Sequence, residues 1–319
     1  GAGQFATAVL LPALARQDGV APRGVCSATG LSAPTGAARH GFAYACSDYR
    51  EILDDPEIDV VFLATRHHQH AGLLLEALRR GKHAFVEKPL ALRPDELEEI
   101  ETFLAQAGGA APCWTVGFNR RFSPAAAAVR AHFADAEEPL TAVYRFNAGD
   151  LPADHWAQDP EVGGGRIIGE ACHGVDLLTF LLGSPPVRVH AEAVAPGAAL
   201  RVAGDRCVLT LRHAHGGVST LLYTAGGDRS FGKERVELFG AGRVGVIDDF
   251  RRVELYRGDR RRARKWGGQP KGHREEIAAF LAAVRAGAPG PIPAADLLAT
   301  TRATFAAVES IRTGRPVDV

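Results

Sequence analysis

Residues 59–88 read DVVFLATRHHQHAGLLLEALRRGKHAFVEK, in which two apolar runs flank a helical repeat. The first run, 59–65, is apolar over most of its length, which indicates a strand buried on both faces of a sheet. Residues 71–80 predict a helix that ends at Gly81, since glycine is common at helix ends. Residues 83–88 predict the next strand. A strand, a helix and a strand in this order predict an α/β fold with a parallel sheet.

The same alternation continues on both sides of this stretch. APRGVCSA at 21–28 predicts an earlier strand, and TVGF at 115–118 predicts the last strand of the series. Pro94 opens a helix between them, with acidic residues in its first turn. We therefore predict a first, parallel α/β domain over residues 1–119.

The residues after 119 have a different pattern. Partly alternating runs with short polar turns predict strands at 139–149, 187–194, 206–213, 217–225, 234–240 and 250–258. Helices are predicted at 172–182, 273–286 and 294–312. We predict an α+β second domain over residues 120–319, with a mainly antiparallel open sheet covered on one face. The uncovered face predicts a homo-oligomer, because symmetric pairing would remove apolar surface from water.

Composition narrows the range of partners. The chain has 319 residues with 37 basic and 37 acidic side chains, so nothing favours nucleic acid or an anionic membrane. The apolar runs are too short for a membrane span. The basic run RRRARK at 260–265 has no aromatic platform and is interpreted as a solvated loop. Five scattered cysteines without a C-x-x-C pair indicate reduced thiols in a cytoplasmic protein, each packed rather than reactive.

The opening GAGQFA fits a dinucleotide-binding turn with alanine in the third small position. Gly1 makes the tight turn, Gly3 lets the backbone approach a pyrophosphate, and Ala6 lets the following helix pack closely. Gln4 and Phe5 would lie beside the same cofactor. Because such a turn normally follows a strand, we expect the first strand to have been cut off or to lie in a preceding module.

The second strand lacks the acidic residue that usually holds the ribose of NAD. It ends instead in Cys26-Ser27-Ala28-Thr29, where Ser27 and Thr29 could bond either a hydroxyl or a phosphate. The choice between NAD and NADP therefore stays open.

The loop Thr65–His70 follows a strand of the parallel sheet and contains three histidines. A compact turn cannot aim all three at one ion, so we expect no metal. Ligands of open α/β sheets bind beyond the carboxyl ends of the strands. Thr65 and His67 are thus expected to line the cofactor groove, and His70 either lines it or caps the next helix.

Lys88 stands at the end of the strand 83–88, between Glu87 and Pro89. Proline fixes the backbone there, which suits a lysine whose amine must be held at one point. The alternative is a solvated lysine in a turn between a strand and a helix.

Several stretches together resemble one known family. DVVFLAT, the loop ending at His70 and GKHAFVEKPLAL look like the family of glucose–fructose oxidoreductase, inositol dehydrogenase and rhizopine catabolism proteins. GFNRRFSP at 117–124 resembles the segment that enters that family's second domain, and GGGRIIGEACHGVDLLTFLLG at 163–183 resembles its catalytic helix. The opening GAG, GFNRRF at 117–122 and LPADHWAQDPEVGGGRIIGEACH at 151–173 closely resemble one branch of this family, in which this module follows a zinc alcohol-dehydrogenase-like half.

The resemblance implies a Rossmann domain that binds NAD or NADP beside Glu87 and Lys88, with the ammonium of Lys88 meeting the reacting hydroxyl. His173 would take part in the proton transfer, a task that histidine performs near neutral pH. The family usually has an aspartate four residues before this histidine. Gly169 stands there, so Glu170 is the nearest candidate to replace it.

Three further residues are implied as neighbours of the substrate. Asp176, one turn after His173, either orients that histidine or bonds to nearby backbone. Arg121 matches the family's arginine beside the cofactor or a substrate hydroxyl, with a structural salt bridge as the alternative. Trp156 offers a flat apolar face to a sugar ring or to nicotinamide.

These features together predict an NAD(P)-dependent oxidoreductase. Its substrate would be the secondary hydroxyl of a sugar, a cyclitol or a nucleotide sugar. Two alternatives are an NAD-dependent glycosidase of the same fold, and a non-catalytic nucleotide-binding module that serves a fused partner.

Overall fold

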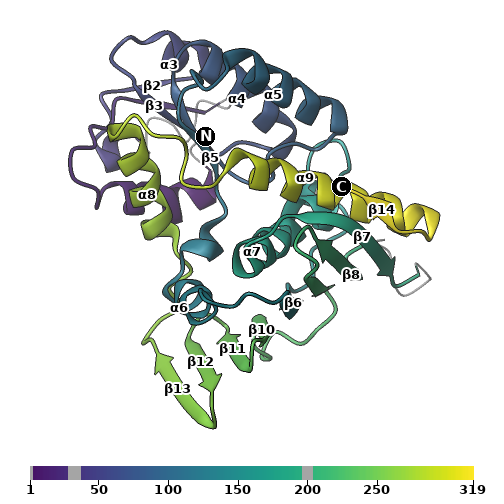
Figure 1. Ribbon diagram of the computed structural model, residues 1–319. Coiled ribbons are helices and arrows are strands. Elements are labelled where there is room, and N and C mark those ends of the chain that lie inside the picture. The colour runs from purple at the N-terminus through teal and green to yellow at the C-terminus, as the bar shows by residue number, and fades with distance from the viewer. Residues whose placement is uncertain (1–2, 28–36, 196–203) are drawn as a thin grey trace. The chain divides into compact units, whose positions relative to one another are not determined.

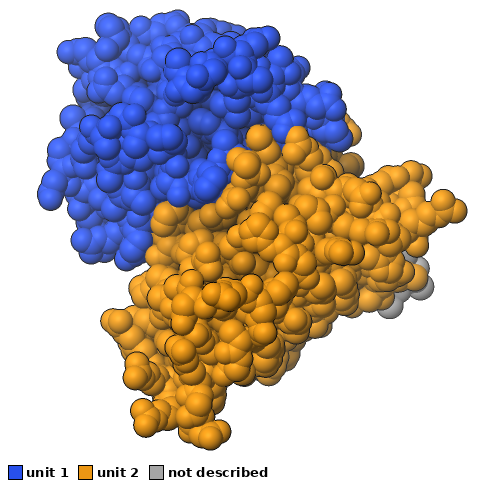
Figure 2. All heavy atoms as spheres, viewed as in Figure 1, with its two compact units in different colours: residues 1–117, 273–294 blue, residues 118–272, 295–319 orange. Residues whose placement is uncertain are grey.

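The computed structural model describes residues 3–27, 37–195 and 204–319. The chain forms two compact units, residues 1–117 with 273–294 and residues 118–272 with 295–319 (Figure 2). Each has its own strands and its own core. No helix in the described ranges is long and apolar enough to span a membrane.

The first unit is built on parallel strands (Figure 1). One ladder joins β3 (Val60–Leu63), β4 (His83–Val86) and β5 (Trp114–Val116), and a second joins β1 (Gly24–Cys26) and β2 (Tyr44–Cys46). The accompanying helical segments are η1 (Ala6–Leu10), α1 (Leu11–Leu14), α3 (Arg50–Asp54), η2 (His67–Gln69), α4 (His70–Arg79) and α5 (Pro94–Ala107). This arrangement confirms the α/β prediction for the N-terminal part.

A helix from late in the sequence completes the core of the first unit. α8 (His273–Arg285) places Ile277 and Phe280 against Phe85 of β4 and Leu10 of η1. The Phe85 and Phe280 rings lie 5.8 Å apart. The predicted boundary at residue 119 left α8 in the second domain, whereas its apolar stripe packs on the first unit.

The second unit contains a nine-stranded sheet in the order β13-β12-β11-β10-β6-β9-β8-β7-β14. Every neighbouring pair is antiparallel except β6 and β9. The strands are β6 (Thr141–Asn147), β7 (Pro186–Ala193), β8 (Arg206–His213), β9 (Val218–Thr224), β10 (Glu234–Gly240), β11 (Arg243–Asp248), β12 (Arg252–Arg257), β13 (Arg260–Lys265) and β14 (Val317–Asp318). The prediction of a mainly antiparallel sheet is confirmed.

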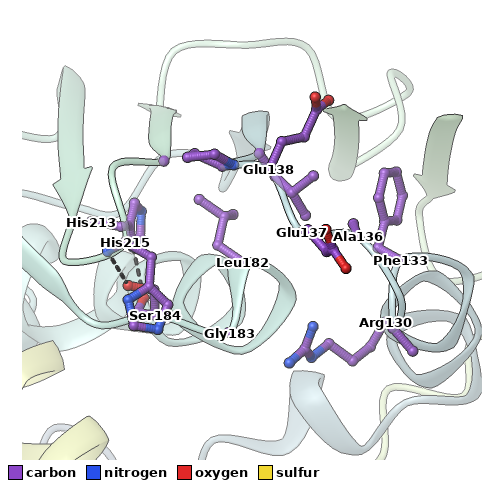
Figure 3. A pocket seen from close by; sticks show the side chains of 14 residues that line it. Arg130, Phe133, Ala136, Glu137, Glu138, Leu182, Gly183, Ser184, His213 and His215 are labelled. Carbon is purple, nitrogen blue, oxygen red and sulfur yellow. Dashed lines mark hydrogen bonds between the residues drawn. The ribbon is translucent and has the colours of Figure 1, made fainter. Parts of the chain in front are cut away.

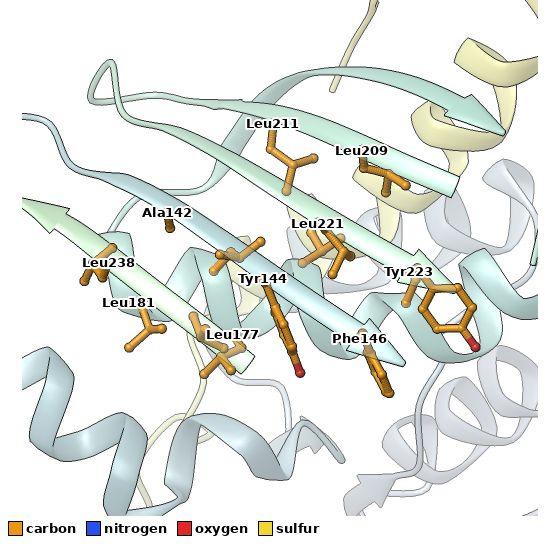
Figure 4. Close-up of a cluster of buried hydrophobic side chains, with 14 of the residues drawn as sticks. Ala142, Tyr144, Phe146, Leu177, Leu181, Leu209, Leu211, Leu221, Tyr223 and Leu238 are labelled. Atoms are coloured by element: carbon orange, nitrogen blue, oxygen red, sulfur yellow. The ribbon is translucent and has the colours of Figure 1, made fainter. Parts of the chain in front are cut away.

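Helices cover one face of this sheet. α7 (Cys172–Leu182) lays Leu177 and Leu181 against Tyr144, Leu221 and Leu238 of the strands (Figure 4). α6 (Pro124–His132) and α9 (Ala294–Thr313) contribute alanines and Val129 to the same cluster. Fully burying a leucine side chain stabilises the folded state by about 1.5–3 kcal/mol, so this cluster is the main source of stability in the unit.

The opposite face carries partly exposed apolar side chains between polar ones. The buried Tyr144, Leu209, Leu221 and Leu238 point toward the helices. The pairing register places their strand neighbours on the opposite face, among them Val143, Val208, Val218, Leu222 and Phe239. The sheet is therefore covered by the chain's own helices on one side only.

The basic run 260–265 was interpreted incorrectly as a loop. It forms strand β13, which pairs with β12 and exposes all six of its residues. Backbone hydrogen bonds to one neighbour hold this edge strand, so its side chains show no apolar alternation. Charged residues on an edge strand also hinder pairing with other chains.

Candidate active site

The turn before η1 places backbone amides at the start of a helix. The first helical hydrogen bond runs from the Thr7 amide to the Gly3 carbonyl at 3.0 Å, so the amides of Gln4, Phe5 and Ala6 precede the helical ladder. Gly3 and Gln4 are exposed, and Phe5 is 41% exposed, whereas Ala6 is buried against the sheet. Backbone amides at a helix start, beside a small buried residue, fit a bound phosphate group. Gly1 lies outside the described residues.

The end of β1 is the second part of the predicted cofactor site. Ser27 is half-buried, and its amide donates to the Cys46 carbonyl of the neighbouring strand at 3.2 Å. This hydrogen bond holds the Ser27 backbone directly after the end of β1. Thr29 lies outside the described residues.

The loop after β3 is anchored by a buried histidine. His70 Nδ1 lies 2.7 Å from the Pro89 carbonyl and Nε2 lies 3.3 Å from the Thr65 carbonyl. Burial lowers the pKa of His70 to about 4, so the ring is neutral near pH 7 and its single proton belongs on Nδ1. His70 therefore ties the loop that begins at Thr65 to the segment holding Lys88. His67 is also buried, with its ring 5.6 Å from that of His70.

Glu87 and Lys88 stand where strand ends of the first unit converge. The Glu87 amide donates to Leu63 and the Gly117 amide donates to Val86, both at 2.8 Å. Lys88 is half-buried and joined to Pro89 by a cis peptide bond. These contacts fix the backbone on the N-terminal side of the lysine.

The Glu87 carboxyl is buried beneath this turn. Burial raises the pKa of Glu87 to about 7, although the neighbouring Lys88 acts in the opposite direction. A Cβ atom on Gly117 would lie 2.9 Å from Glu87 Oε1, so only glycine leaves room for this carboxyl.

In the second unit, His173 stands in the first turn of α7. It is buried, and its ring meets that of Phe118 edge-on at 6.0 Å. The preceding turn, η5 (Ile167–Ala171), is a π-helix, a distortion common at functional sites. Gly174 lets the helix approach Leu221 of the sheet, since a Cβ there would lie 2.8 Å from the leucine side chain.

Glu170 is held by three cationic or hydroxyl donors. Arg166 Nη2 lies 2.5 Å and the Tyr223 hydroxyl 2.7 Å from Oε2, while Lys233 Nζ lies 3.4 Å from Oε1. Sequence reasoning missed these three partners. Arg166 precedes Glu170 by four residues, a helical spacing that could have identified it.

Arg121 forms a buried ion pair. Its Nε and Nη2 donate to the two Asp176 oxygens at 3.1 and 2.5 Å, and Nη1 lies 3.4 Å from Asp296. Burial raises the pKa of Asp176 to about 6, partly offset by Arg121. The structure thus shows the salt bridge that was the alternative for Arg121, and it shows Asp176 as that arginine's anchor.

A second buried ion pair was also missed. Arg120 donates to both Glu234 oxygens at 2.6 and 3.0 Å, and Lys271 Nζ lies 2.7 Å from the same carboxylate. Two cations hold the pKa of Glu234 well below its usual range despite its burial. Burial of this carboxyl depends on residues far apart in the sequence, so no local pattern indicates it.

Trp156 lies in η4 (Trp156–Gln158), a short helix before the glycine run. It is half-buried, with its ring 5.7 Å from that of His155. Among the described residues, no three histidine, cysteine, aspartate or glutamate side chains gather so as to hold a metal ion.

A separate pocket of the second unit lies at the far end of α7. Arg130, Leu182, Ser184 and His213 are among its lining residues (Figure 3). Helices rise about 1.5 Å per residue, so His173, nine residues before Leu182, lies about 14 Å away along the axis. No described residue of the predicted site lines this pocket.

Comparisons with known proteins match both parts of the chain. Residues 1–112 match a family model described as "Oxidoreductase family, NAD-binding Rossmann fold", and residues 129–242 match "GFO/IDH/MocA C-terminal domain". The chain is similar to the uncharacterized oxidoreductase YrbE of Bacillus subtilis, at 27% identity over 89% of this chain and 84% of that protein. It is also similar to inositol 2-dehydrogenase of Rhizobium meliloti, at 28% identity over 90% of this chain and 89% of the other.

A solved structure shows the same fold. Levoglucosan dehydrogenase in complex with NADH and levoglucosan superimposes with a TM-score of 0.83 at 24% identity, covering 100% of this chain and 97% of that chain.

Proposed function

Because the chain belongs to the GFO/IDH/MocA oxidoreductase family, we propose that it oxidises or reduces a secondary hydroxyl carbon of a sugar, cyclitol or nucleotide sugar. It is an NAD(P)-dependent dehydrogenase that acts on CH–OH groups. A bound nicotinamide dinucleotide supplies the hydride acceptor or donor. The similar inositol and levoglucosan dehydrogenases support a polyol as the substrate class.

The observation that carries the proposal is the fixed position of Lys88. Its backbone follows a strand end that is hydrogen-bonded to β3, and the next carbonyl, that of Pro89, accepts from His70. A lysine held this way can present its ammonium to a hydroxyl oxygen at low entropic cost. A solvated surface lysine would need none of these contacts.

His173 is the proposed acid–base residue. In oxidation, the hydroxyl proton passes to His173 while Lys88 hydrogen-bonds the same oxygen; in reduction, the proton returns. Burial beside Phe118 limits the ring's motion, which favours one geometry of proton transfer.

We propose that Glu170 positions His173 and the substrate. Arg166 and Tyr223 already donate to Oε2, so that oxygen is engaged within the unit. Oε1 lies 3.4 Å from Lys233 Nζ, and because a carboxylate oxygen can accept from more than one donor, we propose that it also accepts from a substrate hydroxyl. We propose that the same substrate region is also shaped by Trp156 and by the buried ion pair of Arg121 and Asp176.

The proposed dinucleotide site uses the amides after Gly3, the side chains of Gln4, Phe5, Ser27 and Thr65, and the turn at Glu87. Its glycine turn and buried Ala6 fit a pyrophosphate at a helix start. Ser27 stands where an acidic residue usually holds the ribose, so the cofactor is NAD or NADP, and the screen below tests both.

The test is a cofactor-reduction screen. The purified protein would be incubated with NAD⁺ or NADP⁺ and a panel that includes levoglucosan, myo-inositol and scyllo-inositol, with absorbance at 340 nm as the readout. The proposal predicts formation of reduced cofactor with at least one polyol. Cleavage of a nitrophenyl glycoside without net reduction would instead indicate a glycosidase, and no binding of either dinucleotide would contradict the proposal.

The open face of the nine-stranded sheet is proposed to pair with a second copy of the chain. Val143 and Leu222 lie on it with partly exposed side chains. Fusion of this chain to a zinc alcohol-dehydrogenase-like half stays a prediction. The mass of the natural polypeptide would test it.

A further inference from the structure

Cys26 and Cys46 are directly opposite each other at the ends of two paired strands. β1 and β2 are parallel, and their register pairs Cys26 with Cys46. Backbone hydrogen bonds fix this register on both sides, from Ser27 to Cys46 at 3.2 Å and from Tyr44 to Arg23 at 3.1 Å. Residues in register on parallel strands project to the same face, so the two thiols are neighbours.

The spacing of the strands suits a covalent bond between these sulfurs. Adjacent strands lie about 4.8 Å apart. A disulfide joins Cα atoms that are about 4.4–6.8 Å apart. Both cysteines are half-buried, which leaves them partly open to a small oxidant. The same sequence pattern, an apolar residue followed by Cys-Ser, occurs at both strand ends.

The surroundings distinguish the roles of the two thiols. Burial first, and then the neighbouring Cys26, raise the pKa of Cys46 to about 12, with the nearby acids Glu51 and Asp48 adding to the effect. Cys46 therefore holds its proton near neutral pH, and we assign the first attack on an oxidant to Cys26.

The other cysteines are poorer candidates. Cys113, Cys172 and Cys207 are all buried. Cys207 faces Tyr223 and Ala193 in its ladder, and Cys113 packs in the core with Phe280. They serve as internal controls.

We propose that Cys26 and Cys46 form a disulfide when the protein meets a peroxide, and that this bond weakens dinucleotide binding. The Cys26 thiolate attacks one peroxide oxygen, giving a sulfenic acid and releasing hydroxide. The Cys46 sulfur then attacks the Cys26 sulfur and expels its oxygen as water. In total, two thiols and one hydrogen peroxide give one disulfide and two waters.

The link to the cofactor is the adjacent residue. Ser27 follows Cys26 at the carboxyl end of β1, the edge where ligands of parallel sheets bind. A disulfide would constrain the backbone at that strand end and shift the Ser27 hydroxyl from its position in the reduced protein. Loss of one ribose hydrogen bond should weaken affinity about tenfold. This part of the inference rests on the proposed cofactor site.

The experiment compares reduced and oxidised protein. After treatment with hydrogen peroxide, intact mass spectrometry should show the loss of two hydrogen atoms, and peptide mapping should link Cys26 to Cys46. Affinity for NADH, measured by calorimetry, should fall about tenfold and recover with dithiothreitol. In Cys26→Ala and Cys46→Ala, peroxide should leave NADH affinity unchanged, whereas Cys113→Ala should respond as the parent does.

Each result decides a separate claim. Sulfinic acid at Cys26 without a crosslink, or a link to another cysteine, would overturn the disulfide. A confirmed crosslink with unchanged NADH affinity would overturn its effect on binding. Reduced protein that fails to bind NADH would contradict the proposed function itself, while peptide mapping would still decide on the disulfide.

Discussion

Arg166 donates from Nη2 to Oε2 of Glu170 across one helical turn, at 2.5 Å. The Tyr223 hydroxyl donates to the same oxygen, and Arg166 Nε lies 2.7 Å from that hydroxyl. The three groups form a closed triangle, with Arg166 almost fully buried. The Glu170 carboxylate is thus fixed three residues before His173.

Glu170→Gln should reduce stability and have a smaller effect on turnover than loss of His173. The change keeps the shape but replaces a charge-assisted acceptor, so the free energy of unfolding should fall by about 1–3 kcal/mol. Tyr223→Phe removes one donor and should cost about 0.5–1.5 kcal/mol. Urea unfolding measures both. A Gln variant as stable as the parent would refute the anchoring role, and a turnover loss equal to that of His173→Ala would make Glu170 a proton-transfer group.

Glu87 should make the protein less stable as the pH rises. Its pKa is raised from 4.5 to about 7, so between these values the folded state binds more protons than the unfolded state. The free energy of unfolding should therefore fall as pH increases through this window, by up to about 3 kcal/mol. In Glu87→Gln, the free energy of unfolding should change less with pH over the same range. Denaturation midpoints at several pH values test this, and identical profiles would contradict the buried environment.

His70 should act in the opposite direction. Its pKa is lowered from 6.5 to about 4, so the unfolded state binds more protons between these values. Stability should be lost as the pH falls through that window, again by up to about 3 kcal/mol. In the parent, this pH dependence partly cancels that of Glu87. The quantity to compare is therefore the difference in the free energy of unfolding between His70→Gln and the parent, measured at each pH. A difference independent of pH would refute a neutral, buried His70.

The sequence predicted most elements that have a strong apolar period. The helix at 172–182 has the predicted bounds, and strands β3 and β4 lie within the predicted runs. Two of the missed strands lack that signal, whereas β11 (Arg243–Asp248) was missed although it is largely buried. β2 has three residues, none of them buried, and β13 is wholly exposed because only backbone bonds hold it. α6, with its Ser123 cap and Pro124, was also missed although its start signal is present.

The candidate site was predictable only where its residues are close in sequence. The Glu87-Lys88-Pro89 turn and the helix of His173 could be identified from short stretches. The partners of Glu170 come from three separate stretches of the chain, and Tyr223 lies 53 residues away from it. The Cys26–Cys46 pair depends on strand register, which residue types alone do not give.

Val143→Asp should dissociate the proposed dimer. Val143 is 43% exposed on the open face of β6, and a charge there would have to be buried on pairing. Val308→Asp is the matched control, since Val308 is 41% exposed but lies on α9. Sedimentation at micromolar concentration should show a dimer for the parent and control, and a monomer for Val143→Asp. A monomeric parent would contradict the pairing.

The central claim is that His173 transfers the proton of the reacting hydroxyl. The most direct test is the turnover of His173→Ala with the polyol that is most active in the screen, beside Lys88→Met and the exposed control His190→Ala. Thermal unfolding and NADH affinity would verify that each variant is folded. We expect turnover to fall about 10²–10⁴-fold in His173→Ala with NADH affinity retained, and to stay near the parent value in His190→Ala. Near-normal turnover of a folded His173→Ala variant would contradict the assignment.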